Sequence, residues 1–228
     1  MGDIFHEYMS KRIKDISNSN PFENPGPVVT FSRAAGCSVK NITQLLQERL
    51  NSISKKPKWE IISKEVLHES AERLNLDHET VQTIFNLSDR SLLDDIVNAF
   101  ISRDYQLERK MLNTVVNVIY SFGIEGYKII VGRGSNSICS NIEKSLHIRI
   151  DAPLEWRIQS VMQSKNLSRD KARSNINHLE ANRRNYRQMI KGKASMCNDF
   201  DITFSKIKFC DEEIVDMVVD AMKIKKII

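Results

Sequence analysis

Short apolar runs alternate along the chain with longer segments in which hydrophobic residues recur at helical spacing. The apolar runs, each followed by turn residues, predict five strands, at residues 28–32, 59–62, 127–131, 146–150 and 201–205. Hydrophobic residues three or four apart predict helices at 41–53, 63–74, 77–86, 89–122, 154–163, 168–191 and from 211 onward. This alternation indicates an α/β fold, with a parallel sheet covered by helices on both faces.

The chain before the first strand has a different character. Residues 3–17 carry apolar residues near helical spacing and predict a short amphipathic helix. Residues 18–27 are rich in Asn, Ser, Pro and Gly and predict a linker. We therefore divide the chain into an N-terminal helix with its linker, 1–27, and a core domain, 28–228. Because all five predicted strands lie in the core domain, removal of residues 1–24 should leave it folded.

Composition and charge narrow the classes of protein that fit. With 41% hydrophobic and 28% charged residues, the 228-residue chain suits one globular domain with an appendage. It lacks a run of the roughly 20 apolar residues that a membrane helix needs. Four cysteines far apart argue against a zinc site or a disulfide framework and fit reduced thiols in the cytoplasm. A net charge of +5, without basic runs interleaved with aromatic residues, favours an anionic ligand such as a nucleotide over nucleic acid.

The candidate site is the turn between the first strand and the helix at 41–53. Ligands of parallel sheets bind at the carboxyl ends of strands, and residues 32–40, residues 132–134 and Asp151 all fall there. A glycine-rich turn holds phosphate because its backbone N–H groups point inward and no Cβ intrudes. This turn has one glycine, Gly36, and lacks the pattern G-x-x-x-x-G-K-[ST], so the motif alone favours an ordinary connection. The convergence of three segments makes the turn a candidate phosphate site.

Six motifs follow one another along the core domain. They are Ser32-Arg33-Ala34-Ala35-Gly36-Cys37-Ser38-Val39-Lys40-Asn41-Ile42, Ile62-Ser63-Lys64-Glu65-Val66, Val131-Gly132-Arg133-Gly134, Ala152-Pro153-Leu154-Glu155-Trp156-Arg157-Ile158, the spacing of Glu180, Arg183, Tyr186 and Gly192, and Phe200-Asp201-Ile202-Thr203-Phe204-Ser205. In this order they resemble the cytidylate kinase-like family, P-loop proteins related to nucleoside monophosphate kinases. The family patterns are S-R-x-x-G-S-G-G-R-E-I, D-K-E-L, V-G-R-G, A-P-L-E-x-R-I, D-x-x-R-x-x-Y and Y-D-L-V-I-N-T.

The resemblance implies a P-loop NTPase-type three-layer fold with the first strand in the centre of the sheet and helical monophosphate-binding and lid regions. It implies a phosphotransferase that uses ATP and Mg²⁺ and moves the terminal phosphoryl group to a (d)CMP-like acceptor. The residues implied to bind the nucleotide phosphates are Ser32, Arg33, Gly36, Cys37, Ser38, Val39, Lys40 and Asn41. The residues implied to act in catalysis are Lys40, Arg133, Arg183 and Arg187.

The last two of these arginines lie one helical turn apart. We expect them, with the segment 189–198, to form a lid that stands open without ligand and closes over phosphate. The long helix predicted before Phe122 could pack against a second copy of the chain in a homodimer.

Departures from the family pattern leave a second interpretation open. Ser38 and Val39 stand where the family has glycines, and a β-branched Val39 should stiffen the loop and intrude where a phosphate approaches. Ser63 and Asn41 replace acidic residues, so two carboxylates that could help place Mg²⁺ are missing. The alternative is a domain that has lost catalysis and binds nucleotide as a sensor or a partner-binding module.

Overall fold

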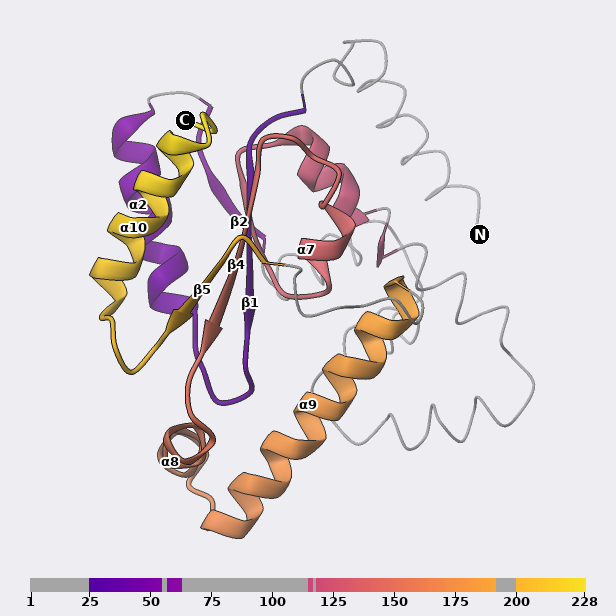
Figure 1. Ribbon diagram of the computed structural model, residues 1–228, viewed down its shortest axis with the longest axis vertical. Coiled ribbons are helices and arrows are strands. Elements are labelled where there is room, and N and C mark those ends of the chain that lie inside the picture. Colours follow the sequence, from indigo (N-terminus) through magenta and orange to yellow (C-terminus); the bar gives the residue numbers. More distant parts are fainter. Residues whose placement is uncertain (1–24, 55–56, 63–114, 117, 192–199) are drawn as a thin grey trace, which may run out of the picture.

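The protein is a three-layer α/β molecule built on one parallel sheet. Figure 1 shows the computed structural model, which describes residues 25–54, 57–62, 115–116, 118–191 and 200–228. The strands lie in the order β2-β3-β1-β4-β5. Their bounds are β1 Val28–Arg33, β2 Glu60–Ile62, β3 Lys128–Val131, β4 Ser145–Asp151 and β5 Ile202–Ser205. All five predicted strands are therefore present, and the first is central, as expected.

The central strand is hydrogen-bonded on both edges and buried on both faces. Val28 is in register with Lys128 of β3 and with Ser145 of β4. Alternate side chains of β1 enter different cores, because Val29 and Phe31 pack on one face while Val28 packs on the other. Burial on both faces explains why the sequence shows a continuous apolar run here and not an alternating one.

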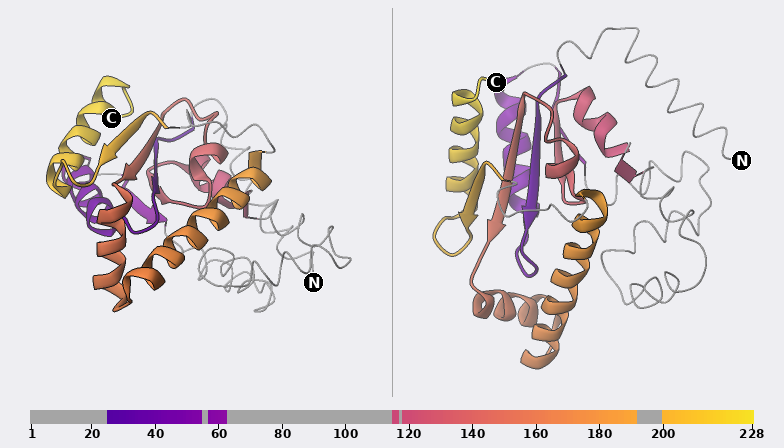
Figure 2. Two further views of the ribbon diagram at one scale, coloured as in Figure 1. Left: turned by 60° about the horizontal axis from the view of Figure 1, so that its bottom comes forward. Right: turned by 45° about the vertical axis from the view of Figure 1, so that its right-hand side comes forward.

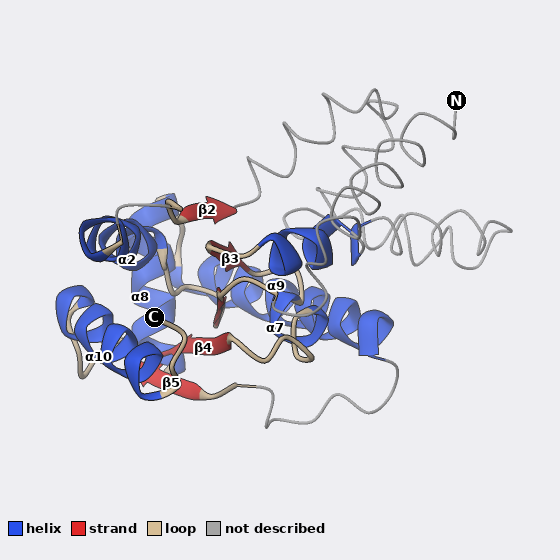
Figure 3. Cartoon of the chain, turned by 90° about the horizontal axis from the view of Figure 1, so that it is seen from above, coloured by secondary structure: helices blue, strands red, loops and turns tan. Residues whose placement is uncertain are grey.

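Helices cover the two faces of the sheet and also lie beyond one of its ends. On one face, α2 (Lys40–Ile53) packs beside α10 (Asp211–Ile224), as Figures 2 and 3 show. The other face is covered by the helical residues 115–116 and 118–125 together with the short α7 (Ser135–Ile138). Beyond the carboxyl ends of the strands lie α8 (Leu154–Lys165) and α9 (Arg169–Lys191), which pack against each other.

The helix predicted to end at Phe122 continues through Gly123 to Glu125. Gly126, the next residue, has a φ of +77°, a left-handed conformation that is common just after a helix. Gly123 stays inside the helix because another segment packs directly against it. A Cβ at this position would lie 2.7 Å from Ile142 Cδ1 and 2.8 Å from Cys139 Sγ. Glycine at this position thus allows the two segments to pack closely, and it does not end the helix.

Some expectations concern other parts of the chain. The helices predicted at 3–17, 63–74 and 77–86 lie outside the described residues, as does most of the one at 89–122. The four-residue α7 was not predicted, because a single helical turn is too short to show a period. Among the described residues, no helix combines the length and the apolar character needed to cross a membrane.

Candidate active site

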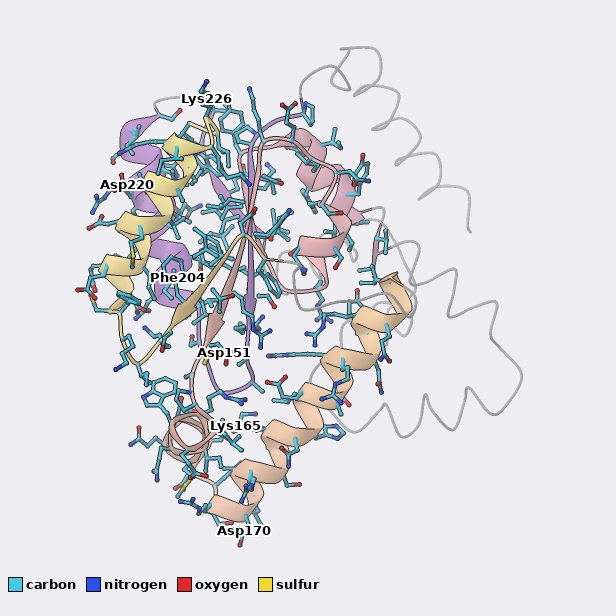
Figure 4. All side chains as sticks on the ribbon, in the orientation of Figure 1. Asp151, Lys165, Asp170, Phe204, Asp220 and Lys226 are labelled. Carbon is cyan, nitrogen blue, oxygen red and sulfur yellow. The ribbon has the colours of Figure 1, made fainter. Side chains whose placement is uncertain are left out.

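The loop of residues 34–39 joins the carboxyl end of β1 to α2 and lies where β3 and β4 also end. The Gly132 amide donates a hydrogen bond to the Phe31 carbonyl at 2.8 Å, and the Ala34 amide donates to the Ile150 carbonyl at 2.9 Å. Asp151, labelled in Figure 4, follows directly at the end of β4. The three segments expected to converge, residues 32–40, 132–134 and 151, therefore meet at one edge of the sheet.

The single glycine of the loop is required by its backbone and by its neighbour. Gly36 has a φ of +93°, a conformation that L side chains rarely adopt. A Cβ at this position would lie 2.9 Å from both the Cβ and the carbonyl oxygen of Arg157 in α8. The loop thus passes so close to α8 that only glycine fits.

Four of the other five side chains of the loop are buried. Ala34, Cys37 and Val39 belong to the core beneath α2 and α10, and Ala35 belongs to the cluster between α8 and α9. The expected intrusion of Val39 into the phosphate space is not found: its side chain is 4% exposed, and its φ of −116° suits a β-branched residue. Ser38 is exposed. The side chain of Val39 therefore does not occupy the outer face of the loop, whereas the hydroxyl of the exposed Ser38 accepts a hydrogen bond from the Lys40 amide at 3.3 Å.

Backbone amides are the groups that the loop leaves available. Within the described part of the chain, no hydrogen bond engages the amides of Gly36, Ser38, Val39, Asn41 and Ile42. The amides of Cys37 and Lys40 are engaged, by the Ala34 carbonyl at 3.1 Å and the Ser38 hydroxyl at 3.3 Å. The start of α2 has no side-chain cap and no acidic residue in its first turn. Unengaged amides at a helix N-terminus form a site suited to an anion.

Side chains of α8 hold two carbonyl groups of the loop. Arg157 Nη1 donates to the Ala35 carbonyl at 3.1 Å, and Ser160 Oγ donates to the Gly36 carbonyl at 2.9 Å. A trans peptide directs the N–H of the following residue opposite to its carbonyl group. Since the Ala35 carbonyl faces α8, the Gly36 amide faces away from α8. Helix α8 thereby orients the Gly36 amide.

The arginines expected to act in catalysis lie on two elements near the loop. Arg133, at the end of β3, has a φ of +56° between Gly132 and Gly134, which are also in the left-handed region. Such strain in a non-glycine residue costs about 1–2 kcal/mol and is typical of functional sites. Burial raises the pKa of Tyr186 on α9 to about 12, while the positive charge of Arg133 acts to lower it. Arg133 therefore lies close enough to Tyr186 for its charge to act on the phenol group.

Helix α9 is in contact with the loop, which differs from the expectation of an open lid. Arg183 Nη1 donates to the Arg33 carbonyl at 2.8 Å, and the Glu180 carboxylate accepts the Ala35 amide at 2.9 Å. Arg187, one turn further along, is half-buried. Lys40 is exposed at the start of α2. The segment expected to move, 189–198, lies largely outside the described residues.

Two ionisable groups lie in or beside the loop, the Cys37 thiol and the Asp151 carboxylate. Burial, with a further contribution from the negative charge of Asp151, raises the pKa of Cys37 to about 11, so this thiol is neutral and not a nucleophile near pH 7. The Asp151 carboxylate accepts hydrogen bonds from Arg149 at 3.1 Å and from the Ala152 amide at 2.8 Å. Among the described residues, no group of three or more His, Cys, Asp or Glu side chains could hold a metal ion.

Sequence reasoning did not assign a role to the residues that shape the loop from outside. Arg157 and Glu180 were visible only as members of family motifs, and Ser160 carried no signal at all. Their hydrogen bonds join residues more than 120 positions apart. Only the packing of α8 and α9 against the loop reveals them.

Comparison with known proteins agrees with the α/β fold. The sequence pattern of the cytidylate kinase-like family matches residues 28–208. An uncharacterized protein from Eubacterium ventriosum ATCC 27560 has a similar structure, with 16% identity, a TM-score of 0.58, and 86% of this chain and 98% of that chain covered. Shikimate kinase from Acinetobacter baumannii, solved in complex with shikimate, aligns with 11% identity, a TM-score of 0.48, and coverage of 88% and 95%. No curated protein sequence matches the chain.

Proposed function

The chain belongs to the cytidylate kinase-like family, and on that premise we propose that it transfers the terminal phosphoryl group of ATP to a (d)CMP-like nucleoside monophosphate. Family membership and the P-loop kinase type of α/β fold support a kinase-like function on nucleotides. The identity of donor and acceptor is the proposal. The observation that carries it is the set of unengaged amides from Gly36 to Ile42 at the carboxyl end of the central strand.

The donor phosphates would lie on this loop. Five unengaged amides and the start of α2 present positive partial charge to an anion. Lys40, in the first turn of α2, would add a full positive charge, and Arg33 lies beside the loop against Gly132. Such a site binds polyphosphate by backbone donors with a few cations, which is how P-loop enzymes stabilise the charge of the transferred group.

The acceptor would lie between the end of β3 and α9. Two enclosed polar atoms in this region, Tyr186 Oη and Asn136 Nδ2, have no hydrogen-bond partner among the described residues. The two side chains come from α9 and α7, which contact each other, and Gly134 lies against the ring of Tyr186. Together with Arg133, these donors suit the oxygen atoms of an anionic acceptor. Arg183 and Arg187 would contribute charge from α9.

Magnesium would enter with ATP. Mg²⁺ in kinases is bound by one or two carboxylates together with substrate phosphates and water. Asp151 and Glu180 are carboxylates at the loop among the described residues. Both oxygens of Asp151 already accept hydrogen bonds, and Glu180 accepts the Ala35 amide and pairs with Arg157. Most ligands would therefore be phosphate oxygens and water, and the ion would neutralise charge on the phosphates.

Three further parts of the proposal concern organisation and location. We propose that residues 1–27 form a separate N-terminal segment before the core domain at 28–228, that the protein works in the cytoplasm, and that it forms homodimers. The widely spaced cysteines support the location. The helix that could form the dimer lies mostly outside the described residues.

The test is a coupled turnover assay with ATP over all common nucleoside monophosphates, together with ATP titration. Lys40→Ala should weaken ATP binding about tenfold, the effect of losing one charged contact to phosphate. Lys58→Ala is the matched control, because Lys58 is also exposed but precedes the amino end of β2. Equal affinity of the two variants would remove Lys40 from the site.

Binding without turnover would favour the alternative of a nucleotide sensor. The absence of an acidic residue from the first turn of α2 is the observation that favours this alternative. Neither binding nor turnover with any nucleotide would refute both functions.

A further inference from the structure

An ion pair between α8 and α9 forms hydrogen bonds with both the amide and the carbonyl group of Ala35 in the loop. The Glu180 carboxylate accepts the Ala35 amide at 2.9 Å, and Arg157 Nη1 donates to the Ala35 carbonyl at 3.1 Å. The two side chains also contact each other, with 3.2 Å between Arg157 Nη1 and Glu180 Oε1. Arg157 Nε donates in addition to the Ala152 carbonyl at 2.9 Å. One guanidinium group thus joins the loop, the end of β4 and α9.

This pair is placed where electrostatic contacts are strong. The side chains of Arg157 and Glu180 are 14% and 27% exposed, so solvent screens their attraction only in part. A second ion pair, Arg169–Glu155, joins the same two helices but is more than half exposed at both residues and makes no contact with the loop. The second pair is therefore a natural control for the first.

The two hydrogen bonds to Ala35 determine the direction of the next amide, that of Gly36. The Ala35 methyl group packs against the α8–α9 cluster, and its peptide groups are bound by the pair, so the residue is fixed on all sides. Because the Ala35 carbonyl faces α8, the Gly36 amide must face the opposite way. If the loop already has this shape in the free protein, anion binding does not include the free-energy cost of ordering it.

We propose that Arg157 and Glu180 are positioning residues that hold the loop of residues 34–39 in its anion-binding shape. Their hydrogen bonds from α8 and α9 direct the backbone N–H groups, a role that additional glycines have in other phosphate loops. The role of the loop in holding nucleotide phosphate rests on the proposed function. The effect of the pair on the shape of the loop does not, and it can be measured without any ligand.

Hydrogen exchange of the ligand-free protein tests the effect on shape. In Glu180→Ala, peptides that span residues 33–43 should exchange about tenfold faster, since a hydrogen bond to a charged group is lost. Glu180→Gln keeps an acceptor for the Ala35 amide but removes the charge, and should give a smaller increase. Glu155→Ala should leave the exchange of this segment unchanged. Peptides from β1 and β4 should exchange as in the wild type in all three variants.

Two results of this experiment would overturn the inference. One is unchanged exchange of residues 33–43 in Glu180→Ala. The other is a parallel acceleration in β1, β4 and the loop, which would show that the pair stabilises the whole domain and does not position the loop. Arg157→Lys keeps the positive charge, but a lysine lacks the planar guanidinium group that contacts the Ala35 carbonyl, the Ala152 carbonyl and the Glu180 carboxylate together. It should accelerate the same segment, and no local effect would count equally against the inference.

Titration with Mg·ATP then connects shape with binding. Glu180→Ala should weaken binding about tenfold more than Glu155→Ala at equal stability, because the loop must be ordered during binding. If the wild type binds no ATP, the proposed function fails while the exchange result still decides the inference. If the wild type binds ATP and the two variants bind it equally well, the positioning role fails and the proposed function stands.

Discussion

Replacement of the loop glycine by alanine should destabilise the protein for two separable reasons. At Gly36 an alanine must adopt a φ of +93°, which costs about 1–2 kcal/mol. Its Cβ must also lie 2.9 Å from the Cβ and the carbonyl oxygen of Arg157, and relief requires a shift of the α8 backbone. Overpacking of this kind costs about 1–3 kcal/mol. We therefore expect Gly36→Ala to lower the free energy of unfolding by about 2–5 kcal/mol.

Gly132→Ala separates the two contributions. Gly132 has a similar φ of +76°, but a Cβ there would meet only Arg33 Nη1, at 3.0 Å, which is the far end of a flexible side chain. This variant should cost only the backbone contribution of about 1–2 kcal/mol. Urea unfolding of both variants, followed by circular dichroism, measures the difference. Equal losses would show that the close approach of α8 to the loop contributes nothing to stability, and would refute the reasoning.

Two further predictions concern the loop and the edge of the sheet. Val39→Gly should lower the free energy of unfolding, measured in urea, by about 2–3 kcal/mol, because the valine side chain is in the core. The same variant should not bind ATP more tightly. Ser38→Gly should change the free energy of unfolding by under about 1 kcal/mol. Partial burial acts to raise the pKa of Asp201, but the hydrogen bond from the His147 amide and the ion pair with Lys225 outweigh it and lower the pKa. The stability that Asp201 contributes is therefore present above its ordinary pKa of about 4 and is lost as the pH falls through the lower folded value. Melting temperatures measured from pH 5 to pH 2.5 should fall more steeply in the wild type than in Asp201→Asn, and parallel curves would contradict the assignment.

Local sequence features determined the strands and the place of the site. Each strand is a short segment that contains apolar residues and is followed by turn residues, and such a segment is recognisable without knowledge of its partners. The central position of β1 followed from the family resemblance and is confirmed by the order of the sheet. The single glycine of the loop was also visible in the sequence, although the reason for it was not. That reason is the position of Arg157 on α8.

Tertiary structure alone decided how the side chains in and around the loop are directed. Val39 appears in the sequence as an obstacle to phosphate, yet the fold turns its side chain into the core. In the sequence, Arg183 appears as part of a mobile lid and Glu180 only as a member of a family motif. In the structure, Glu180 binds the Ala35 amide, and Arg183 binds the Arg33 carbonyl at the end of β1. The contacts at the loop join distant residues: Ala35 and Glu180 are 145 positions apart, and Ala35 and Arg157 are 122 positions apart. Hydrophobic period and local motifs describe only neighbours along the chain, so they define the elements, while the direction of each side chain at the loop is decided by which helix packs against it.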